Sequence, residues 1–337
     1  MKLQFLNKLL ERKDLSLDEA QTLMEGMLKG SLTPSQIAAF LTALRMKGET
    51  TNEILGFIKV LRKHMVKIKT SGLVIDTCGT GGDGKGTFNI STAVAFVVVG
   101  AGVKVAKHGN RAVSSLCGSA DVLEALGVNI NLTPVQAEEV LEKVGMVFLF
   151  APLFHPAFKN VSPVRKELGV RTIFNYLGPF LNPVQAKRQL IGVANRQMAE
   201  KLATAATKLD YEYLLIVTGE DGIDEVSLSG KTVVFEVRGQ TKAKRIVEPV
   251  KYGFRKAGRD EIIGGGILRN AEIIKDILKG EQSAKQDIVV LNSAAALYVA
   301  GKVKKVEDGV VLARKVINEG RAKKILSNLI SETQKYA

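Results

Sequence analysis

Residues 73–87 read LVIDTCGTGGDGKGT, and this stretch decides the fold. The apolar run at 73–78 predicts a short strand that ends in a glycine-rich loop. FNIST at 88–92 and the apolar residues after it predict a helix capped by Ser91 or Thr92. Glycines let the backbone approach a ligand closely, and the free N–H groups of a helix start attract anions. The stretch therefore predicts an α/β unit that binds a phosphate-rich ligand, although capping alone would also explain the two hydroxyls.

Two better-known phosphate-binding patterns fit this loop only in part. The GxGxxG spacing at 79–84 is typical of dinucleotide sites, which also need an acidic residue about 20 positions later for the ribose. The next strand candidate instead places Lys107 near its end, and a cation suits a phosphate better than a ribose diol. The loop also resembles a P-loop, but Gly86 follows Lys85 where a hydroxyl is needed for magnesium. Both interpretations are therefore disfavoured.

Strand-like and helix-like runs alternate through most of the remaining chain. Helical patterns at 119–127, 133–145 and 198–210 separate several of the apolar runs. Such alternation is typical of a largely parallel sheet, while two antiparallel pairings are expected near 212–250, where no clear helix intervenes. The strand candidates after the glycine loop are 103–109, 146–151, 188–193, 213–219, 232–237 and 288–291.

The first seventy residues carry only helical signals. Capping-box patterns occur at 16–19 and 33–36, and Thr51 opens a further helix. We therefore expect an α/β fold class with two domains. A small all-helical domain spans 1–70, and a large α/β domain with a mostly parallel central sheet flanked by helices spans 71–337.

The composition indicates an ordinary globular protein with excess positive charge. Hydrophobic residues make up 46% and charged residues 24%, which excludes a disordered chain, a collagen and a coiled-coil rod. The formal net charge of +14 favours anionic partners of any kind. No apolar run approaches the ~18 residues of a membrane helix, and the N-terminus shows no signal peptide. Two well-separated cysteines, Cys78 and Cys117, favour a reduced, cytoplasmic setting.

Several sequence blocks occur together and identify a family. GTGGDGxxTFNIST begins at Gly79, and it is followed by KHGNR at 107–111, SS at 114–115, GSAD at 118–121, VRKELGVRTIFNYLGPFLNP at 164–183 and GIDEV at 222–226. In order and spacing these blocks resemble the anthranilate phosphoribosyltransferase family over essentially the whole chain. The resemblance implies transfer of the phosphoribosyl group of phosphoribosyl pyrophosphate (PRPP) to the amine of anthranilate, a step of tryptophan biosynthesis.

The resemblance also carries expectations about architecture and cofactor. It implies a fold similar to that of pyrimidine nucleoside phosphorylases, with part of 165–190 joining the helical domain. It implies homodimers that associate through that domain. It further implies Mg²⁺ as the cofactor, with two ions in each active site.

By resemblance, three groups of residues form the active site. The donor is expected to contact Gly79, Gly82, Asp83, Thr87, Asn89, Ile90, Ser91, Thr92, Lys107, His108, Gly109, Asn110, Arg111, Ala112, Val113, Ser114, Ser115 and Ser119. Anthranilate is expected to contact Gly79, Asn110, Arg165, His108 and His155. The metal ligands are expected to be Ser91, Asp224 and Glu225. No side chain is assigned as a nucleophile, acid or base.

Elementary chemistry supports these roles unequally. Lys107 at a strand end suits a phosphate, whereas Arg111 could equally form a structural ion pair. His108 and His155 could line the acceptor channel or simply pack. Asp83 is a hypothetical member of the metal environment.

Two other functions remain as alternatives. A pyrimidine nucleoside phosphorylase would share the fold, but the sequence near Ser91, Arg165 and Asp224 favours the transferase. A nucleic-acid-binding relative without transferase activity would explain the basic clusters at 242–245 and 321–324. The chain has no Trp and no recognised nucleic-acid-reading motif, so we expect small-molecule substrates and no membrane or nucleic-acid partner.

Overall fold

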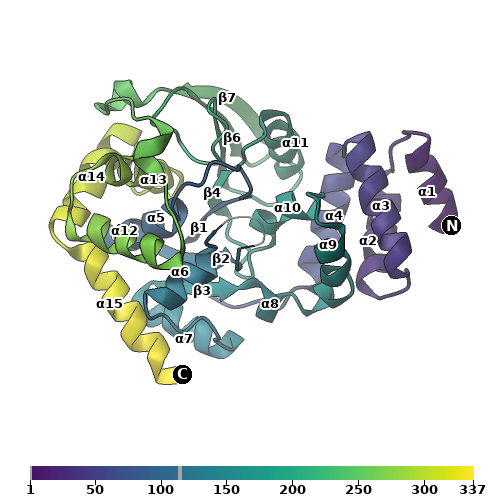
Figure 1. Ribbon diagram of the computed structural model, residues 1–337, viewed down its shortest axis with the longest axis horizontal. Helices are drawn as coiled ribbons and strands as arrows, with labels where there is room; N and C mark the ends of the chain where they lie inside the picture. Colours follow the sequence, from purple (N-terminus) through teal and green to yellow (C-terminus); the bar gives the residue numbers. More distant parts are fainter. Residues whose placement is uncertain (1, 113–115) are drawn as a thin grey trace.

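The computed structural model describes residues 2–112 and 116–337, and it places a seven-stranded sheet between two layers of helices (Figure 1). The strand order is β3-β2-β1-β4-β5-β6-β7. β1 to β5 pair in parallel, and β6 pairs antiparallel with both β5 and β7, which gives the two antiparallel pairings expected near 212–250, although no strand was assigned at β7. The strands are β1 Val74–Gly79, β2 Lys104–Gly109, β3 Met146–Phe150, β4 Arg188–Gly192, β5 Tyr213–Gly219, β6 Thr232–Arg238 and β7 Thr241–Val247.

Two strand assignments from sequence differ from the structure. The candidate at 288–291 is wrong, because these residues lie within helix α13 (Ala284–Val299). All four are fully buried, and a helix buried on every side shows no periodicity that separates it from a strand. The edge strand β7 was missed, because its residues are mostly exposed and polar and carry no apolar alternation.

The helices follow the predicted pattern elsewhere. The three helical stretches expected at 119–127, 133–145 and 198–210 correspond to α6, α7 and α11. The α-helices not yet given are α1 Lys2–Leu10, α2 Leu17–Leu28, α3 Pro34–Lys47, α4 Thr51–His64, α5 Ile90–Gly100, α6 Ser119–Ala125, α7 Pro134–Val144, α8 Ala151–Phe154, α9 Ser162–Leu168, α10 Phe174–Leu177, α11 Arg196–Ala206, α12 Ile267–Lys279, α14 Val306–Asn318 and α15 Arg321–Thr333. Short 3₁₀ turns lie at Pro156–Asn160, Gly178–Leu181, Pro249–Tyr252, Arg259–Ile262 and Gln334–Tyr336.

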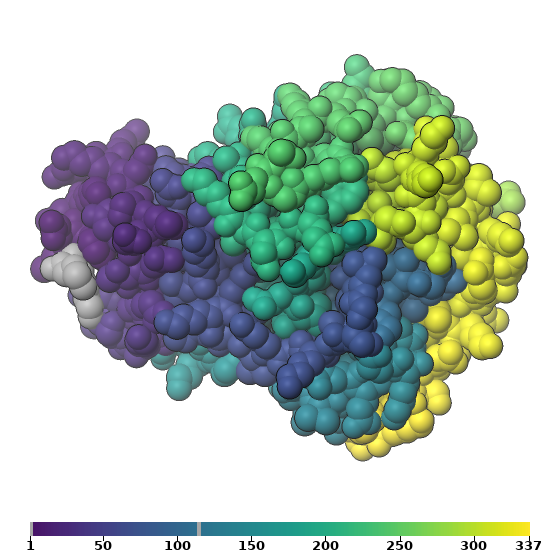
Figure 2. All heavy atoms as spheres, turned by 180° about the vertical axis from the view of Figure 1, so that it is seen from behind, coloured from purple at the N-terminus to yellow at the C-terminus, as the bar shows by residue number. Residues whose placement is uncertain are grey.

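The N-terminal helices begin where local capping dictates. Ser16, Thr33 and Thr50 each accept a hydrogen bond from the third residue of the helix that follows, and each forms a complete capping box. The helices gather at one end of the molecule, away from the C-terminal helices (Figure 2). This confirms the small helical domain. Among the described residues, no helix is long and apolar enough to cross a membrane.

Two apolar clusters cover the two faces of the sheet. In β4 and β5, alternate residues point to opposite faces, so that Leu190 and Leu215 join one cluster while Ile191 and Leu214 join the other. The first cluster contains α5 and α12 to α15, and the second contains the N-terminal helices with α9, α10 and α11. The carboxyl ends of the parallel strands remain open between these layers, at the edge where ligands bind in such sheets.

Candidate active site

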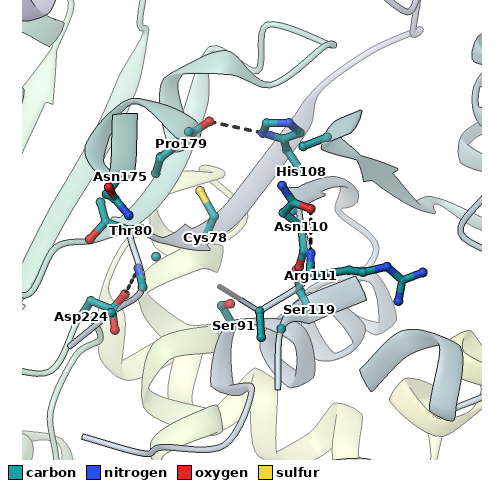
Figure 3. Close-up of a pocket in the computed structure, with 18 of the residues that line it drawn as sticks. Cys78, Thr80, Ser91, His108, Asn110, Arg111, Ser119, Asn175, Pro179 and Asp224 are labelled. Carbon is teal, nitrogen blue, oxygen red and sulfur yellow. Dashed lines mark hydrogen bonds between the residues drawn. The ribbon is translucent and has the colours of Figure 1, made fainter. Parts of the chain in front are cut away.

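A cavity of about 690 Å³ lies at the carboxyl edge of the parallel strands. It is lined by the loops that follow β1, β2 and β3, by the turn after β5, and by residues from α9 and α10. In Figure 3, Thr80, Asn175 and Asp224 lie on one side of it, and Asn110 and Ser119 lie on the other. Segments far apart in the sequence therefore converge on one site.

The glycine loop forms the donor side of this cavity. Gly81, Gly82, Gly84 and Gly86 all have φ between +64° and +69°, a backbone region that favours glycine. The Lys85 N–H donates to Asp83 Oδ1 at 3.0 Å, which closes a turn inside the loop. The other Asp83 carboxylate oxygen is buried without a hydrogen-bond partner. The expected donor residues Gly79, Gly82, Asp83, Thr87, Asn89, Ile90 and Ser91 all line the cavity.

Asp224 and Glu225 face the glycine loop from the turn after β5. The Gly81 N–H donates to Asp224 Oδ2 at 2.8 Å, and a Cβ atom on Gly79 would lie only 2.2 Å from that oxygen. Burial, with the nearby charge of Asp83, raises the pKa of Asp224 to about 6. Burial and the charge of Asp224 also raise the pKa of Glu225 well above its ordinary value. The three carboxylates thus form a concentration of incompletely compensated negative charge.

This donor set fits Mg²⁺. The unpartnered oxygen of Asp83 and the raised pKa values of Asp224 and Glu225 indicate that a cation would stabilise the charged forms. Within 2–112 and 116–337, no three acidic, His or Cys side chains converge closely enough to hold a metal by themselves. Mg²⁺ commonly uses one or two carboxylates and completes its shell with water and substrate phosphates, so this arrangement remains compatible with it.

The start of α5 differs from the prediction. Asn89 occupies the capping position without a side-chain cap, and Ser91 and Thr92 lie in the first helical turn. The prediction that Ser91 or Thr92 caps the helix is therefore wrong. Ser91 lines the cavity, whereas Thr92 is fully buried and does not line it. The Ile90 N–H donates to Phe88 O at 2.7 Å and the Thr92 N–H donates to Asn89 O at 3.1 Å, so the Ser91 hydroxyl is the feature of this helix start that suits an anion.

Lys107 lines the cavity, but it is buried rather than exposed at a strand end. It is 1% exposed, and its Nζ donates to Thr77 O at 2.6 Å and to Ser91 Oγ at 3.0 Å. Burial lowers the pKa of Lys107, and the nearby carboxylate of Asp76 opposes this shift. Asn182 donates to Asp76 Oδ2 at 2.8 Å and fixes this buried acid under the site. The cation is thus held in place before a ligand arrives.

The loop after β2 is braced by its own ion pairs. Arg111 bonds Asp121 at 3.2 Å and Glu124 at 2.9 Å, and in Figure 3 its side chain extends away from the other labelled residues. This geometry favours the structural interpretation of Arg111 over direct donor binding. Arg111 nevertheless lines the cavity, as do the expected residues His108, Gly109, Asn110, Ala112 and Ser119. The expected donor residues Val113, Ser114 and Ser115 lie outside the described residues.

The acceptor side is built from aromatic rings, two histidines and one arginine. The His108 and His155 Nε2 atoms are 3.0 Å apart, and His108 Nδ1 lies 3.3 Å from Gly178 O. Burial lowers the pKa of His108 to about 3 and that of His155 to about 4, so both rings are neutral near pH 7. Arg165 stacks over the Phe174 ring at 5.2 Å and lines the cavity. A planar cation beside an apolar slot suits an aromatic carboxylate.

Several cavity residues escaped the sequence-based assignment. Thr80 and Asn175 line the donor side, and Phe158 and Lys159 line the acceptor side. Phe158 packs edge-on against Phe174 at 5.5 Å. Asn175 lies in the NYL segment, and Phe158 and Lys159 lie in the PAFK segment. Neither segment carries a pattern that distinguishes a cavity wall from a packed turn.

Comparison with known proteins agrees with this geometry. Residues 3–65 match the helical bundle domain of the glycosyl transferase family, and residues 71–323 match its a/b domain. The anthranilate phosphoribosyltransferase of Acetivibrio thermocellus is 49% identical over 98% of this chain and 96% of its own length. That of Chloroflexus aurantiacus is 48% identical, over 95% of each chain. This chain belongs to the anthranilate phosphoribosyltransferase family.

Solved structures of other anthranilate phosphoribosyltransferases have the same fold. The Thermus thermophilus enzyme superposes with a TM-score of 0.91 at 39% identity, covering 98% of this chain and 99% of its own. The Saccharomyces cerevisiae enzyme, solved in complex with PRPP and Mg, has a TM-score of 0.90 at 28% identity and covers 99% and 98%. The family and its pentosyl transfer, first indicated by sequence blocks, are thereby confirmed.

Proposed function

We propose that this protein transfers the phosphoribosyl group of PRPP to the amine of anthranilate, with Mg²⁺, in tryptophan biosynthesis. The observation that carries the proposal is the joining of two unlike halves in one cavity. The half around the glycine loop has backbone N–H groups, Lys107 and three carboxylates. The half around Arg165 has aromatic walls and neutral histidines. Such a pair suits a polyanionic donor beside an aromatic acid.

The donor half supplies binding rather than covalent chemistry. Breaking the bond at the ribose carbon develops positive charge on the sugar and negative charge on the departing pyrophosphate. We assign the N–H groups of the glycine loop and the Ser91 hydroxyl to the phosphates, together with Lys107. We assign Mg²⁺ to Asp224, Glu225 and Ser91, with two ions per site, where it would neutralise the leaving pyrophosphate.

The acceptor half orients a weakly basic aromatic amine. Arg165 would hold the carboxylate of anthranilate, and Asn110 lies across the cavity within the same site. His108 and His155 would contact the ring as neutral groups, because burial keeps their pKa values at about 3 and about 4. We assign the rate enhancement mainly to positioning and charge stabilisation, so no nucleophilic side chain is required.

We further propose a homodimer formed through the helical domain. Leu3, Leu10 and Met46 on the contacting helices α1 and α3 are between 66% and 72% exposed, and exposed apolar side chains on neighbouring helices favour a partner surface. Substitution of Leu10 by Lys should shift the mass in light scattering toward the monomer. The same change at Leu268, 75% exposed on α12, serves as the control and should leave the mass unchanged.

The domain boundary is also proposed to be discontinuous. Val164, Ile173 and Leu177 belong to the same apolar cluster as the N-terminal helices, which supports assigning part of 165–190 to the helical domain. Cys78 and Cys117 form no disulfide, which is consistent with the proposed cytoplasmic setting.

A direct assay tests the proposed reaction. Anthranilate fluorescence should fall when the protein, Mg²⁺ and PRPP are all present, and the absence of Trp keeps the protein background low. Omission of either Mg²⁺ or PRPP should abolish the change. A constant signal despite PRPP binding in calorimetry would indicate a different amine acceptor. Failure to bind PRPP would instead favour the nucleic-acid-binding alternative.

A further inference from the structure

Two carbonyl groups of the glycine loop accept hydrogen bonds from an arginine outside the loop. Arg171 Nη2 donates to Gly81 O at 2.9 Å, and its Nη1 donates to Gly82 O. The N–H of the same Gly81 donates to Asp224 Oδ2 at 2.8 Å. Gly81 is thus hydrogen-bonded to the guanidinium of Arg171 through its carbonyl and to the carboxylate of Asp224 through its N–H.

The loop needs such an external constraint. Its four glycines with positive φ can adopt many other conformations, and ordering glycine costs more conformational entropy than ordering any other residue. Within the loop, the turn from Lys85 N to Asp83 Oδ1 fixes only three residues. Without contacts from outside, few of its conformations would point the N–H groups into the cavity.

The side chain of Arg171 packs against the ring of Tyr176. Its guanidinium lies 5.1 Å from the centre of the Tyr176 ring, and it sits between α9 and α10. Gly82 has φ +66°, which favours glycine, and a Cβ atom there would lie 2.7 Å from Nη1 and displace the guanidinium. The charge of Arg171 also lowers the pKa of Asp224, in opposition to burial. Two adjacent carbonyls match the planar fork of a guanidinium, which the ammonium of lysine cannot reproduce.

We propose that Arg171 is a positioning residue for the donor loop. This inference rests on the proposed PRPP transfer. Arg171 is absent from the cavity lining, so it acts through the loop: it occupies the carbonyl groups and leaves N–H groups of the loop facing the donor. The same segment carries Arg165 six residues earlier, and therefore joins the acceptor half to the donor half of the cavity.

The expected signature is a selective loss of donor binding. Arg171→Ala should raise the KM for PRPP at least about tenfold, because the loss of one charge-assisted hydrogen bond changes an equilibrium constant by roughly that factor. The KM for anthranilate should change by less than about twofold, because the Arg165 contacts are unchanged. Millimolar guanidinium chloride should restore part of the PRPP affinity by occupying the vacated space, and Arg171→Lys should be intermediate.

Arg62 offers a matched control. It also lies over a tyrosine ring, at 5.2 Å from Tyr211, and donates to a backbone carbonyl, that of Phe180, at 2.8 Å. Arg62→Ala should lower thermal stability without changing the KM for PRPP or responding to guanidinium. If Arg171→Ala does not fold, Arg171→Lys alone decides the question through its KM for PRPP.

Two measurements separate failure of this inference from failure of the proposed function. A wild-type protein that binds PRPP in calorimetry without consuming anthranilate would overturn the proposed reaction, and the comparison of PRPP dissociation constants would still test Arg171. An unchanged PRPP affinity in Arg171→Ala, an equal rise in the KM for both substrates, or the absence of guanidinium rescue would overturn the positioning role.

Discussion

The two halves of the cavity offer a ligand opposite kinds of chemistry. The donor half consists of glycine backbone with positive φ, a buried lysine and three carboxylates, and it offers charge and N–H groups. The acceptor half consists of aromatic rings, two neutral histidines, a stacked arginine and Lys159, and it offers shape and two cationic side chains. The comparison teaches that a flexible backbone can recognise a polyanion only when charged side chains outside it hold its conformation.

The largest effect is expected from the donor half. Glu225→Ala should lower kcat by at least about a hundredfold even with Mg²⁺ saturating, because the charge on the leaving pyrophosphate would lose part of its compensation. Glu220→Ala provides the control, since Glu220 lies on the same turn but is exposed. Both variants are measured by steady-state kinetics across a Mg²⁺ titration. Intact turnover in Glu225→Ala would show that the metal assignment is wrong.

A smaller and differently directed effect is expected from the acceptor half. Arg165→Ala should raise the KM for anthranilate roughly tenfold to a hundredfold, since a charged hydrogen-bonded pair is lost, and should leave the dissociation constant of PRPP nearly unchanged. The neighbouring, exposed Lys166→Ala is the control for a general loss of positive charge. A comparable loss of PRPP affinity in Arg165→Ala would mean that the two halves do not act separately.

The last effect is absent at neutral pH and concerns stability in acid. His108 and His155 have native pKa values of about 3 and about 4, below the ~6.5 of an unfolded histidine, so the unfolded chain binds more protons as the pH falls below about 6.5. Each histidine should therefore reduce the unfolding free energy by up to about 1.4 kcal/mol per pH unit between about pH 6.5 and its native pKa.

Urea unfolding at a series of pH values measures this slope. The variant His108→Asn should show a shallower dependence than the wild type between about pH 6 and pH 4.5, and the difference should vanish above pH 7. Equal slopes in the two proteins would mean that His108 is not kept neutral by its surroundings. The contrast between the charged donor half and the neutral histidines of the acceptor half would then weaken.

Local signals in the chain were sufficient for much of the fold. Capping boxes at Ser16 and Thr33, the alternation of strands with helices, and the glycine loop after β1 each depend on a few neighbouring residues, and each is confirmed. Sequence-based assignment failed for elements whose degree of burial hides the usual periodicity of apolar residues. Helix α13 is apolar on all sides and resembled a strand, and β7 is polar because it lies at the sheet edge.

The candidate site divides in the same way. Residues adjacent in sequence, such as Lys107 and His108 on β2, were identified together, and strand alternation explains why one reaches the donor half while the other contacts Gly178 beside the acceptor. Thr80 and Asn175 were missed, because their place on the cavity wall follows from the approach of the β1 loop to α10.

The sequence by itself determined the N-terminal helices, the parallel strands, the glycine loop and the family, because propensity, capping and motif spacing act over short distances in the chain. Only the tertiary structure decided that Lys107 is buried, that Arg111 forms ion pairs with acidic side chains, and that Arg171 donates hydrogen bonds to the glycine loop. Those outcomes depend on which charges meet in the folded chain, and Arg171 lies 89 residues from its nearest partner in the loop.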